Sequence, residues 1–156
     1  MAEGRFSLGW EETCGRTRSV DFFLEAGGGM AHKEVVHVPG LKTIGPYSQA
    51  VRAGGLLFVS GQPGVNPATG EAAGATFDVQ ARQAFQNLET VLRAGRSRPD
   101  LVVNTTVLLT DVGNFAEFNC LFGEFFPTNP PARMTMTVPL PKGLLISIGC
   151  VAAIEN

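Results

Sequence analysis

Charged residues are scarce in this chain. Asp, Glu, Lys and Arg make up 17% of its 156 residues, where a soluble domain usually has about a quarter. The net charge is −2, which gives no electrostatic attraction to nucleic acid or to an anionic membrane. No apolar run approaches the roughly 18 residues of a membrane-spanning helix. We therefore expect a globular protein without a nucleic-acid or membrane partner, part of whose weakly charged surface is covered by other subunits.

Cysteine and histidine are also rare. The three cysteines, Cys14, Cys120 and Cys150, lie far apart and form no C-x-x-C pair, which fits unpaired thiols in a reducing compartment. The cytoplasm is the expected location, with the mitochondrion as the alternative. His32 and His37 have no cysteine or carboxylate cluster beside them, so the ligand set of a zinc site is missing. We expect neither a bound metal nor a cofactor.

Residues 1–29 differ from the rest of the chain. They contain no helix or strand pattern of useful length and end in three glycines before Met30. They lack the basic start and apolar run of a secretory signal, and their acidic residues outnumber the basic ones. We predict a disordered extension, or translation assigned from an upstream start with Met30 as the working one. One domain over residues 30–156 is expected to follow.

The remaining chain alternates between strand and helix patterns. Gly54-Gly55 separates two short apolar runs, which is a strong hairpin signal. Asp78 opens a stretch with apolar residues every three or four positions that ends at Gly95, and Asp111 or Asn114 caps a second helix. The expected strands are 35–38, 49–53, 56–61, 101–109, 132–138 and 144–152, and the expected helices run from 78 to about 93 and from 111 or 114 to Pro127.

This order, β-β-β-α-β-α-β-β, predicts an α+β sandwich with both helices on one face of a mixed six-stranded sheet. Four phenylalanines recur at helical spacing in the second helix, and we expect them to pack on the sheet rather than to line a ligand pocket. They are Phe115, Phe118, Phe122 and Phe125. The strand at 144–151 is apolar on both faces, which indicates that the second face of the sheet is also buried, by subunit association.

A series of segments then resembles one protein family. In order they are "IGPYSQAV" at 44–51, "LLFVSGQ" at 56–62, "ARQAFQNLETVL" at 81–92, "TTVLLTD" at 105–111, "FAEFN" at 115–119, "FFPTNPPAR" at 125–133 and "LPKG" at 140–143. Together they closely resemble the RidA family, also called YjgF. The resemblance covers nearly all of residues 35–152.

The resemblance implies a chorismate-mutase-like fold assembled as a homotrimer, with the sheets around a central barrel and the helices outside. It also implies three ligand clefts between neighbouring subunits. The best-known members hydrolyse 2-imino acids, released by pyridoxal-phosphate enzymes, to 2-oxo acids and ammonia. Other members are described as ribonucleases (endoribonuclease L-PSP) or translation inhibitors.

The matched positions give the candidate site. Arg133 falls on the family's substrate-binding arginine, and a guanidinium can grip the carboxylate of an imino acid through two parallel hydrogen bonds. Its alternative role is a salt bridge at a subunit contact. Tyr47 matches the tyrosine of the GPYSQ turn, where it would wall the cleft or bond substrate or water, or else simply stabilise the turn. We predict Arg133 and Tyr47 as catalytic residues.

Other matched positions would complete the substrate site. Ser60 and Gly61 match the end of the SGQ strand, where hydroxyl and backbone would face the pocket. Asn119 ends the FAEFN motif and would bind substrate or bond across a subunit contact. Thr135 replaces the family's frequent cysteine and shares a strand face with Arg133, because side chains alternate. Gly149 is the last of the predicted substrate-binding positions.

The strand "ISIGC" departs from the family pattern. Active deaminases usually have a strand like "VEIEA", whose second glutamate orients the attacking water. Ser147 and Gly149 stand at the two glutamate positions, and Cys150 points to the other face. One hypothesis keeps the imine deaminase activity through carboxylate binding and a positioned water. Another makes the protein a carboxylate binder, with Gly149 giving room to a bulkier ligand. Ribonuclease activity is the weakest, since Arg93, Arg96 and Arg98 form the only basic cluster.

Overall fold

The computed structural model describes residues 32–41, 43 and 45–155. They belong to one unit, Ala31–Asn156, while the extension predicted at residues 1–29 lies outside the described residues. Short 3-10 turns lie at Pro99–Leu101 and Val112–Asn114. The elements in chain order are β1 (Glu34–Val36), β2 (Ala50–Ala53), β3 (Leu56–Pro63), α1 (Phe77–Ala94), β4 (Val102–Leu109), α2 (Phe115–Phe125), β5 (Ala132–Thr137) and β6 (Ile146–Ala153).

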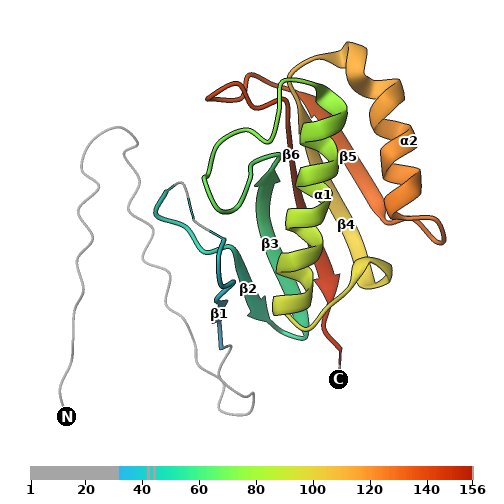
Figure 1. The fold of residues 1–156 in the computed structure, drawn as a ribbon. Coiled ribbons are helices and arrows are strands. Elements are labelled where there is room, and N and C mark those ends of the chain that lie inside the picture. The colour runs from blue at the N-terminus through green and yellow to red at the C-terminus, as the bar shows by residue number, and fades with distance from the viewer. Residues whose placement is uncertain (1–31, 42, 44, 156) are drawn as a thin grey trace, which may run out of the picture. The chain divides into compact units, whose positions relative to one another are not determined.

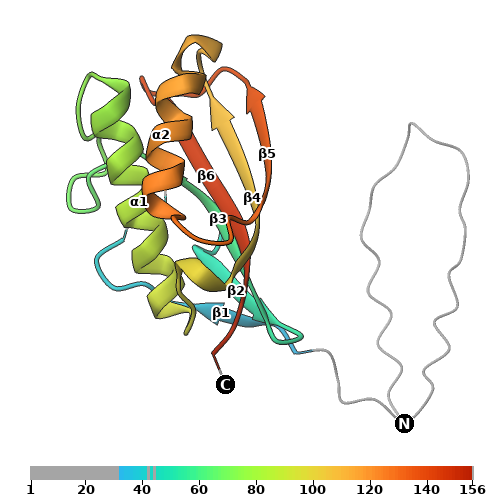
Figure 2. The same ribbon diagram turned by 90° about the vertical axis from the view of Figure 1, so that its right-hand side faces the viewer.

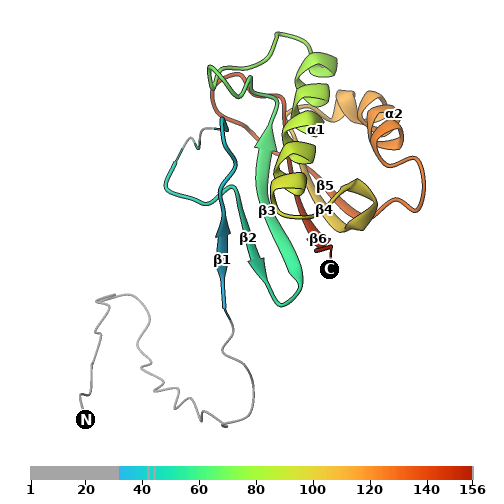
Figure 3. The same cartoon turned by 60° about the horizontal axis from the view of Figure 1, so that its bottom comes forward.

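The six strands form one sheet in the order β1-β2-β3-β6-β4-β5. Strands β4 and β5 are parallel, with α2 as their crossover, and all other neighbours are antiparallel. Both helices lie on one face of the sheet (Figures 1 and 2). Helix α1 packs over β3 and β6, and α2 lies at the β4–β5 side (Figure 3). The predicted mixed sheet with two helices on one face is confirmed.

Local sequence explains the hairpin and the first helix. Gly54 and Gly55 both have positive φ, 58° and 78°, as the tight turn between β2 and β3 requires. Helix α1 buries one stripe that includes Phe85 and Leu88. At its end, a Cβ on Gly95 would lie 2.3 Å from the side chain of Leu57, so the residue after the helix has to be glycine for the chain to pass this close to β3.

The second helix begins after a capped turn. The carboxylate of Asp111 accepts a hydrogen bond from the Gly113 N–H at 2.8 Å, while Asn114 makes no capping bond. Of the two cap residues expected from sequence, Asp111 therefore makes the bond, and it caps the short turn that leads into α2. Phe118 and Phe122 from α2 are buried with Phe85 from α1, and Phe125 stacks on Phe85. The expected aromatic core is confirmed for these three of the four α2 residues, whereas Phe115 is 40% exposed.

The face of the sheet away from the helices has a large apolar surface. We call it the open face. Val35, Phe58, Met134 and Met136 lie on it and are 43%, 45%, 55% and 41% exposed. On the helix side, by contrast, Ile146, Ile148, Cys150 and Ala152 of β6 are all buried. An apolar surface of this kind favours burial against another chain. No helix in the described part of the chain combines the length and apolar character that a membrane crossing needs.

A β-bulge interrupts the pairing of β3 with β6. Val59 pairs with Cys150 and Gln62 with Ile148, so Ser60 and Gly61 together stand opposite Gly149. Bulges of this kind bend a strand and redirect its side chains, often next to functional sites. The bulge is held from the β2 side, because the Ser60 hydroxyl donates to the Ser48 carbonyl at 2.7 Å and the Ser60 N–H donates to the Gln49 carbonyl at 3.0 Å.

Candidate functional site

Arg133 projects from β5, the edge strand of the sheet, towards α2. Its Nη2 donates a hydrogen bond of 2.9 Å to the Asn119 side-chain oxygen. The guanidinium carbon also lies 5.6, 5.3 and 4.7 Å from the ring centroids of Phe115, Phe118 and Phe122. These distances are within the range of cation–π attraction. The aromatic stripe of α2 therefore serves the core on one side and surrounds a cation on the other.

Arg133 has no acidic partner in the described part of the chain. Arg52, Arg82, Arg93 and Arg98 each form an ion pair with an Asp or Glu, and Arg133 does not. Its partner Asn119 is a neutral amide, so none of the groups that bond or stack on the guanidinium carries a negative charge to compensate it. Its other N–H groups include a second edge suited to the two oxygens of a carboxylate. This arrangement is what an anion-binding site needs.

Thr135 lies two residues further along β5, on the same face as Arg133. It pairs with Val107 of β4, whose side chain is fully buried on the helix side. The Thr135 hydroxyl is buried and has no hydrogen-bond partner among the residues that the structure describes. Buried polar atoms usually have one, so this hydroxyl is an unexplained polar group on the Arg133 side of β5. We call Arg133, Asn119 and Thr135 the Arg133 group.

A second set of predicted residues gathers on the open face. A Cβ built on Gly61 would lie 2.6 Å from the hydroxyl of Ser147, so the missing side chain of Gly61 leaves room for that of Ser147. Gly61 is exposed, and Ser60 and Gly149 are half-buried beside it. We call Ser60, Gly61, Gly149 and Tyr47 the Gly61 group. The sequence prediction did not include Ser147 among the site residues, although its alternation with the buried Ile146 and Ile148 indicates this face.

The space above Gly149 is taken by the chain itself. A Cβ at this position would lie 3.2 Å from the Val59 carbonyl oxygen and 3.6 Å from the Gly61 nitrogen. Glycine here permits the close approach of the β3 bulge. This geometry does not support the expectation that Gly149 makes room for a bulkier ligand.

Tyr47 lies in the loop before β2. Its N–H donates to the Gly45 carbonyl at 2.9 Å, as expected for a turn, and 42% of the residue is exposed. It lines a pocket together with Val35 and His37 from the first strand and its continuation. Tyr47 directly precedes Ser48, whose carbonyl accepts the bond from the Ser60 hydroxyl, which is why it is counted with the Gly61 group.

The register places the two groups on opposite sides of the sheet. Arg133 pairs with Thr105, and Thr105 pairs with Cys150, so these three share the helix side. Gly149 and Ser147 alternate with Cys150 and face the other way. Strand β4 also separates β5 from β6, a distance of about 10 Å across the sheet. The structure thus brings the predicted site residues together as two half-sites and not as one site within a single chain.

Cys150 takes no part in either half-site. It is buried among the core residues beneath α1, and this burial raises the pKa of its thiol to about 12. A thiol with so high a pKa stays protonated at neutral pH and is a poor nucleophile. Its predicted role as a small buried residue on the other face is consistent with this position.

Buried amides, which the sequence did not single out, hold the strand ends near the Gly61 group. Gln62 donates to the Gln49 side chain at 3.2 Å and to the Ser60 carbonyl at 2.9 Å. Gln80 of α1 donates to the Gly143 carbonyl at 3.1 Å and accepts from the Leu145 N–H at 2.9 Å. These bonds fix both the bulge of β3 and the start of β6. Their only signal in the sequence is a polar residue within an apolar helix or strand pattern.

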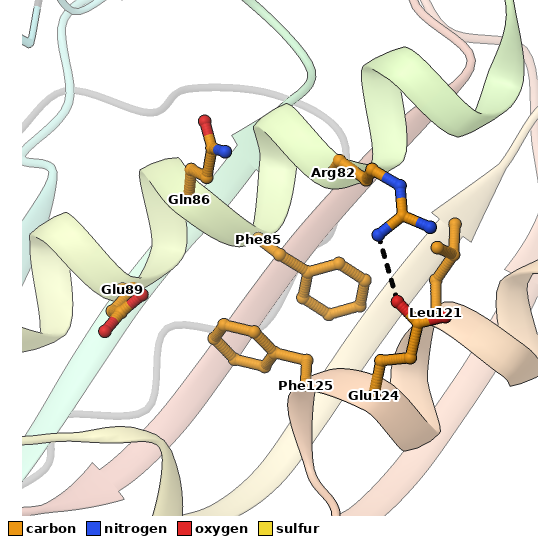
Figure 4. Close-up of a pocket in the computed structure, with 7 residues that line it drawn as sticks. All are labelled: Arg82, Phe85, Gln86, Glu89, Leu121, Glu124 and Phe125. Atoms are coloured by element: carbon orange, nitrogen blue, oxygen red, sulfur yellow. Dashed lines mark hydrogen bonds and ion pairs between the residues drawn. The ribbon is translucent and has the colours of Figure 1, made fainter.

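A separate pocket lies between the helices, away from both half-sites. Phe85 and Phe125 form its floor, and the ion pair of Arg82 with Glu124 spans from α1 to α2 (Figure 4). Arg82 also pairs with Asp78 of its own helix, so its positive charge is compensated, and with Glu89 in the lining the pocket carries an excess of negative charge. It contains none of the predicted site residues. No cluster of His, Cys, Asp and Glu that could hold a metal occurs in the described residues.

Comparisons with known proteins identify related chains. Residues 39–154 match the family model described as "Endoribonuclease L-PSP". A RutC family protein of Sinorhizobium fredii is 46% identical over 112 residues, which cover 71% of this chain and 89% of that protein. Reactive Intermediate Deaminase A of Arabidopsis thaliana, a chloroplastic protein, is 37% identical over 112 residues, which cover 71% of this chain and 60% of that protein.

The fold is also found among solved structures. The crystal structure of the YjgF gene product from E. coli has a TM-score of 0.72 with this chain and is 34% identical in sequence. The match covers 78% of this chain and 99% of that one.

Proposed function

The chain belongs to the Endoribonuclease L-PSP family, which includes the RidA, RutC and YjgF proteins, and from that premise we propose that it hydrolyses 2-imino acids to 2-oxo acids and ammonia. The relative from Arabidopsis thaliana bears the name of a deaminase. The proposed reaction consumes water and needs no metal or cofactor. We place it in the cytoplasm, with the mitochondrion as the alternative.

One observation carries this proposal. Arg133 is a guanidinium without a carboxylate partner in the described residues, bonded to a neutral amide and surrounded by aromatic rings. Such a group binds the carboxylate that every 2-imino acid retains. The Thr135 hydroxyl, which is buried and unpartnered among the described residues, lies on the same strand face and is a second polar group on this side of the proposed site.

The two half-sites fit a cleft shared between subunits of a homotrimer. In this arrangement the Arg133 group of one subunit faces the Gly61 group of its neighbour, and the apolar open faces are buried together. The carboxylate is bound by Arg133, and the imine carbon is presented to water near Gly61, Ser147 and Tyr47. Water adds to the C=N bond, the nitrogen gains a proton, and the carbinolamine releases ammonia to leave the 2-oxo acid.

No carboxylate stands at either glutamate position of β6. Ser147 and Gly149 occupy them, and neither side chain is a general base at neutral pH. Rate enhancement would come from orientation of the imine and the water. The contribution of a general base, typically about 10²–10⁴-fold, would be missing.

This absence favours a second candidate function, that of a non-catalytic carboxylate binder. The binding half of the site is complete in Arg133, Asn119 and Thr135, while the half expected to activate water is reduced to a hydroxyl. A binder of this kind would be stabilised by 2-oxobutanoate without any turnover of the imine.

Ribonuclease activity has less support in spite of the family description. Arg93 is paired with Glu89, and Arg98 is paired with Asp100 and Glu155. The basic cluster at 93–98 is therefore largely neutralised and does not form the positive track that RNA binding requires. We do not propose this activity.

The decisive experiment generates 2-iminobutanoate in a coupled reaction and traps it with semicarbazide. Active protein lowers the yield of semicarbazone in proportion to its concentration, and Arg133→Ala abolishes the effect. Undiminished trapping at high protein concentration would exclude deaminase activity on this substrate. A rise in the melting temperature with 2-oxobutanoate in the same preparation would then support the binder.

A further inference from the structure

Phe115 is an exposed aromatic residue at the start of α2. It is 40% exposed, whereas Phe118 is 0% and Phe122 is 6% exposed. All three belong to the same helical stripe, and all three approach the guanidinium of Arg133. Two of them are thus accounted for by the core, and Phe115 is not.

The ring contacts make the same distinction. Phe118 and Phe122 contact each other and the ring of Phe85, at centroid distances of 5.5, 6.2 and 6.4 Å. Among the described residues, no aromatic pair includes Phe115. The ring of Phe115 instead interacts with Arg133, whose guanidinium carbon lies 5.6 Å from the ring centroid. The ring of Phe115 therefore contributes little to the interior of the protein. It contacts the Arg133 guanidinium on the side that faces solvent.

Arg133 needs such a boundary because of where it lies. It is exposed, on an edge strand, and carries a long side chain with many rotamers. Its hydrogen bond to Asn119 fixes one nitrogen, but a single bond leaves the plane of the guanidinium free to rotate about it. Aromatic faces on several sides restrict that plane, since a guanidinium is attracted to the face of a ring and stacks on it.

We propose that Phe115 is a positioning residue, which together with Asn119 orients the guanidinium of Arg133 so that its unbonded edge is presented to an incoming carboxylate. Asn119 accepts the hydrogen bond from Nη2. Phe118 and Phe122 contact the guanidinium from the core, and the exposed ring of Phe115 contacts it from the solvent side. The inference rests on the proposed anion-binding role of Arg133. Phe115 does not touch the ligand in this proposal and affects its binding only through the orientation of Arg133.

The test compares Phe115→Leu with Phe115→Tyr in the full-length protein. Leucine keeps an apolar side chain suited to a helix but removes the ring, while tyrosine keeps the ring. Val112→Ala is the matched control, because Val112 is 70% exposed just before α2 and is not one of the described side chains that bond or stack on the Arg133 guanidinium. The probe is 2-oxobutanoate, titrated by NMR, and ¹⁵N-edited spectra follow the Nε–Hε resonance of Arg133.

We expect Phe115→Leu to weaken 2-oxobutanoate binding about two- to fivefold, the value of one exposed cation–π contact. Phe115→Tyr and Val112→Ala should bind like the parent protein. Where imine hydrolysis is measurable, KM should rise by the same factor with kcat nearly unchanged. The Arg133 Nε–Hε resonance should lose part of its ring-current shift in the leucine variant and keep it in the tyrosine variant.

Parent-like binding by Phe115→Leu would overturn the proposal. So would a lower melting temperature or a smaller assembly in that variant, because Phe115 would then be a structural or contact residue. If the parent protein binds no 2-oxobutanoate, the proposed function fails. The ring-current shift of the Arg133 Nε–Hε resonance then tests by itself whether Phe115 positions the guanidinium. An unchanged ring-current shift in Phe115→Leu would then reject it.

Discussion

Ser147→Glu is the substitution that most directly tests whether a carboxylate on β6 can activate the attacking water as a general base. The family pattern places two glutamates in this strand, and both are absent here. The structure separates the two positions. The side chain of Ser147 already lies against Gly61 on the open face, where a longer carboxylate could extend over the exposed glycine. A side chain at Gly149 would instead meet the backbone of the β3 bulge.

The expected magnitudes differ accordingly. A glutamate at 147 that acts as general base should raise kcat for imine hydrolysis by about 10²-fold or more, since such groups contribute about 10²–10⁴-fold. At Gly149 the first atom added would lie 3.2 Å from the Val59 oxygen, a contact that only a shift of the bulge relieves. Overpacking costs about 1–3 kcal/mol, so the longer side chain of Gly149→Glu should lower the melting temperature by several degrees.

The assay is the semicarbazide trap, run with Ser147→Glu, Ser147→Gln and Gly149→Glu at equal concentrations. Glutamine has nearly the same length as glutamate without its basicity, so it separates the chemistry of the carboxylate from its size. The gain for Ser147→Glu should appear as pH rises through the pKa of the new carboxyl and should be missing in Ser147→Gln. Equal rates for these two variants, or a gain in Gly149→Glu without loss of stability, would refute the reasoning.

Three further predictions concern other parts of the molecule. Arg133→Lys should weaken 2-oxobutanoate binding about ten- to hundredfold, because an ammonium cannot replace a planar fork that makes charged hydrogen bonds; NMR titration checks this, with Arg96→Lys as a control expected to bind normally. Met134→Lys adds a charge to the open face and should give monomers in light scattering, and an assembly of unchanged mass would contradict the burial of that face. Unfolding free energy should fall above about pH 9, since the unfolded chain releases the Cys150 proton that the folded protein keeps up to about pH 12. This loss is at most about 1.4 kcal/mol per pH unit, and urea titrations at pH 8 and 10 should show a smaller difference for Cys150→Ala.

The sequence predicted the fold where local signals and burial agree. Gly54-Gly55 specified the hairpin because both positions require positive φ. The spacing of Phe118 and Phe122 specified the buried side of α2 because no other arrangement hides both rings. The last strand was predicted to begin at Leu144 but begins at Ile146. The reason is a long-range bond, from the Leu145 N–H to the side chain of Gln80, which no local pattern contains.

The candidate site was less accessible to sequence reasoning. Motif matching chose Arg133 and Gly149 as members of one site, but it carries no information on which face of the sheet a strand presents after a bulge. Ser60 and Gly61 of β3 both oppose Gly149. Because of this one-residue bulge, Gly61 lies beside Ser147. The surroundings of Arg133 combine residues from β5 and α2 whose contact depends on the crossover between two parallel strands. A motif names these residues without placing them.

The placement of the two half-sites on opposite sides of the sheet has a genetic consequence. If neighbouring subunits share each cleft, a chain with a defective Arg133 and a chain with a blocked Gly61 carry different, non-overlapping lesions. Neither forms an active assembly alone. Expressed together, they would assemble into mixed oligomers in which some clefts receive the intact half from each parent. Two such alleles would complement each other, although they lie in the same gene. A chain with both lesions would complement neither of them, because every cleft to which it contributes lacks one intact half.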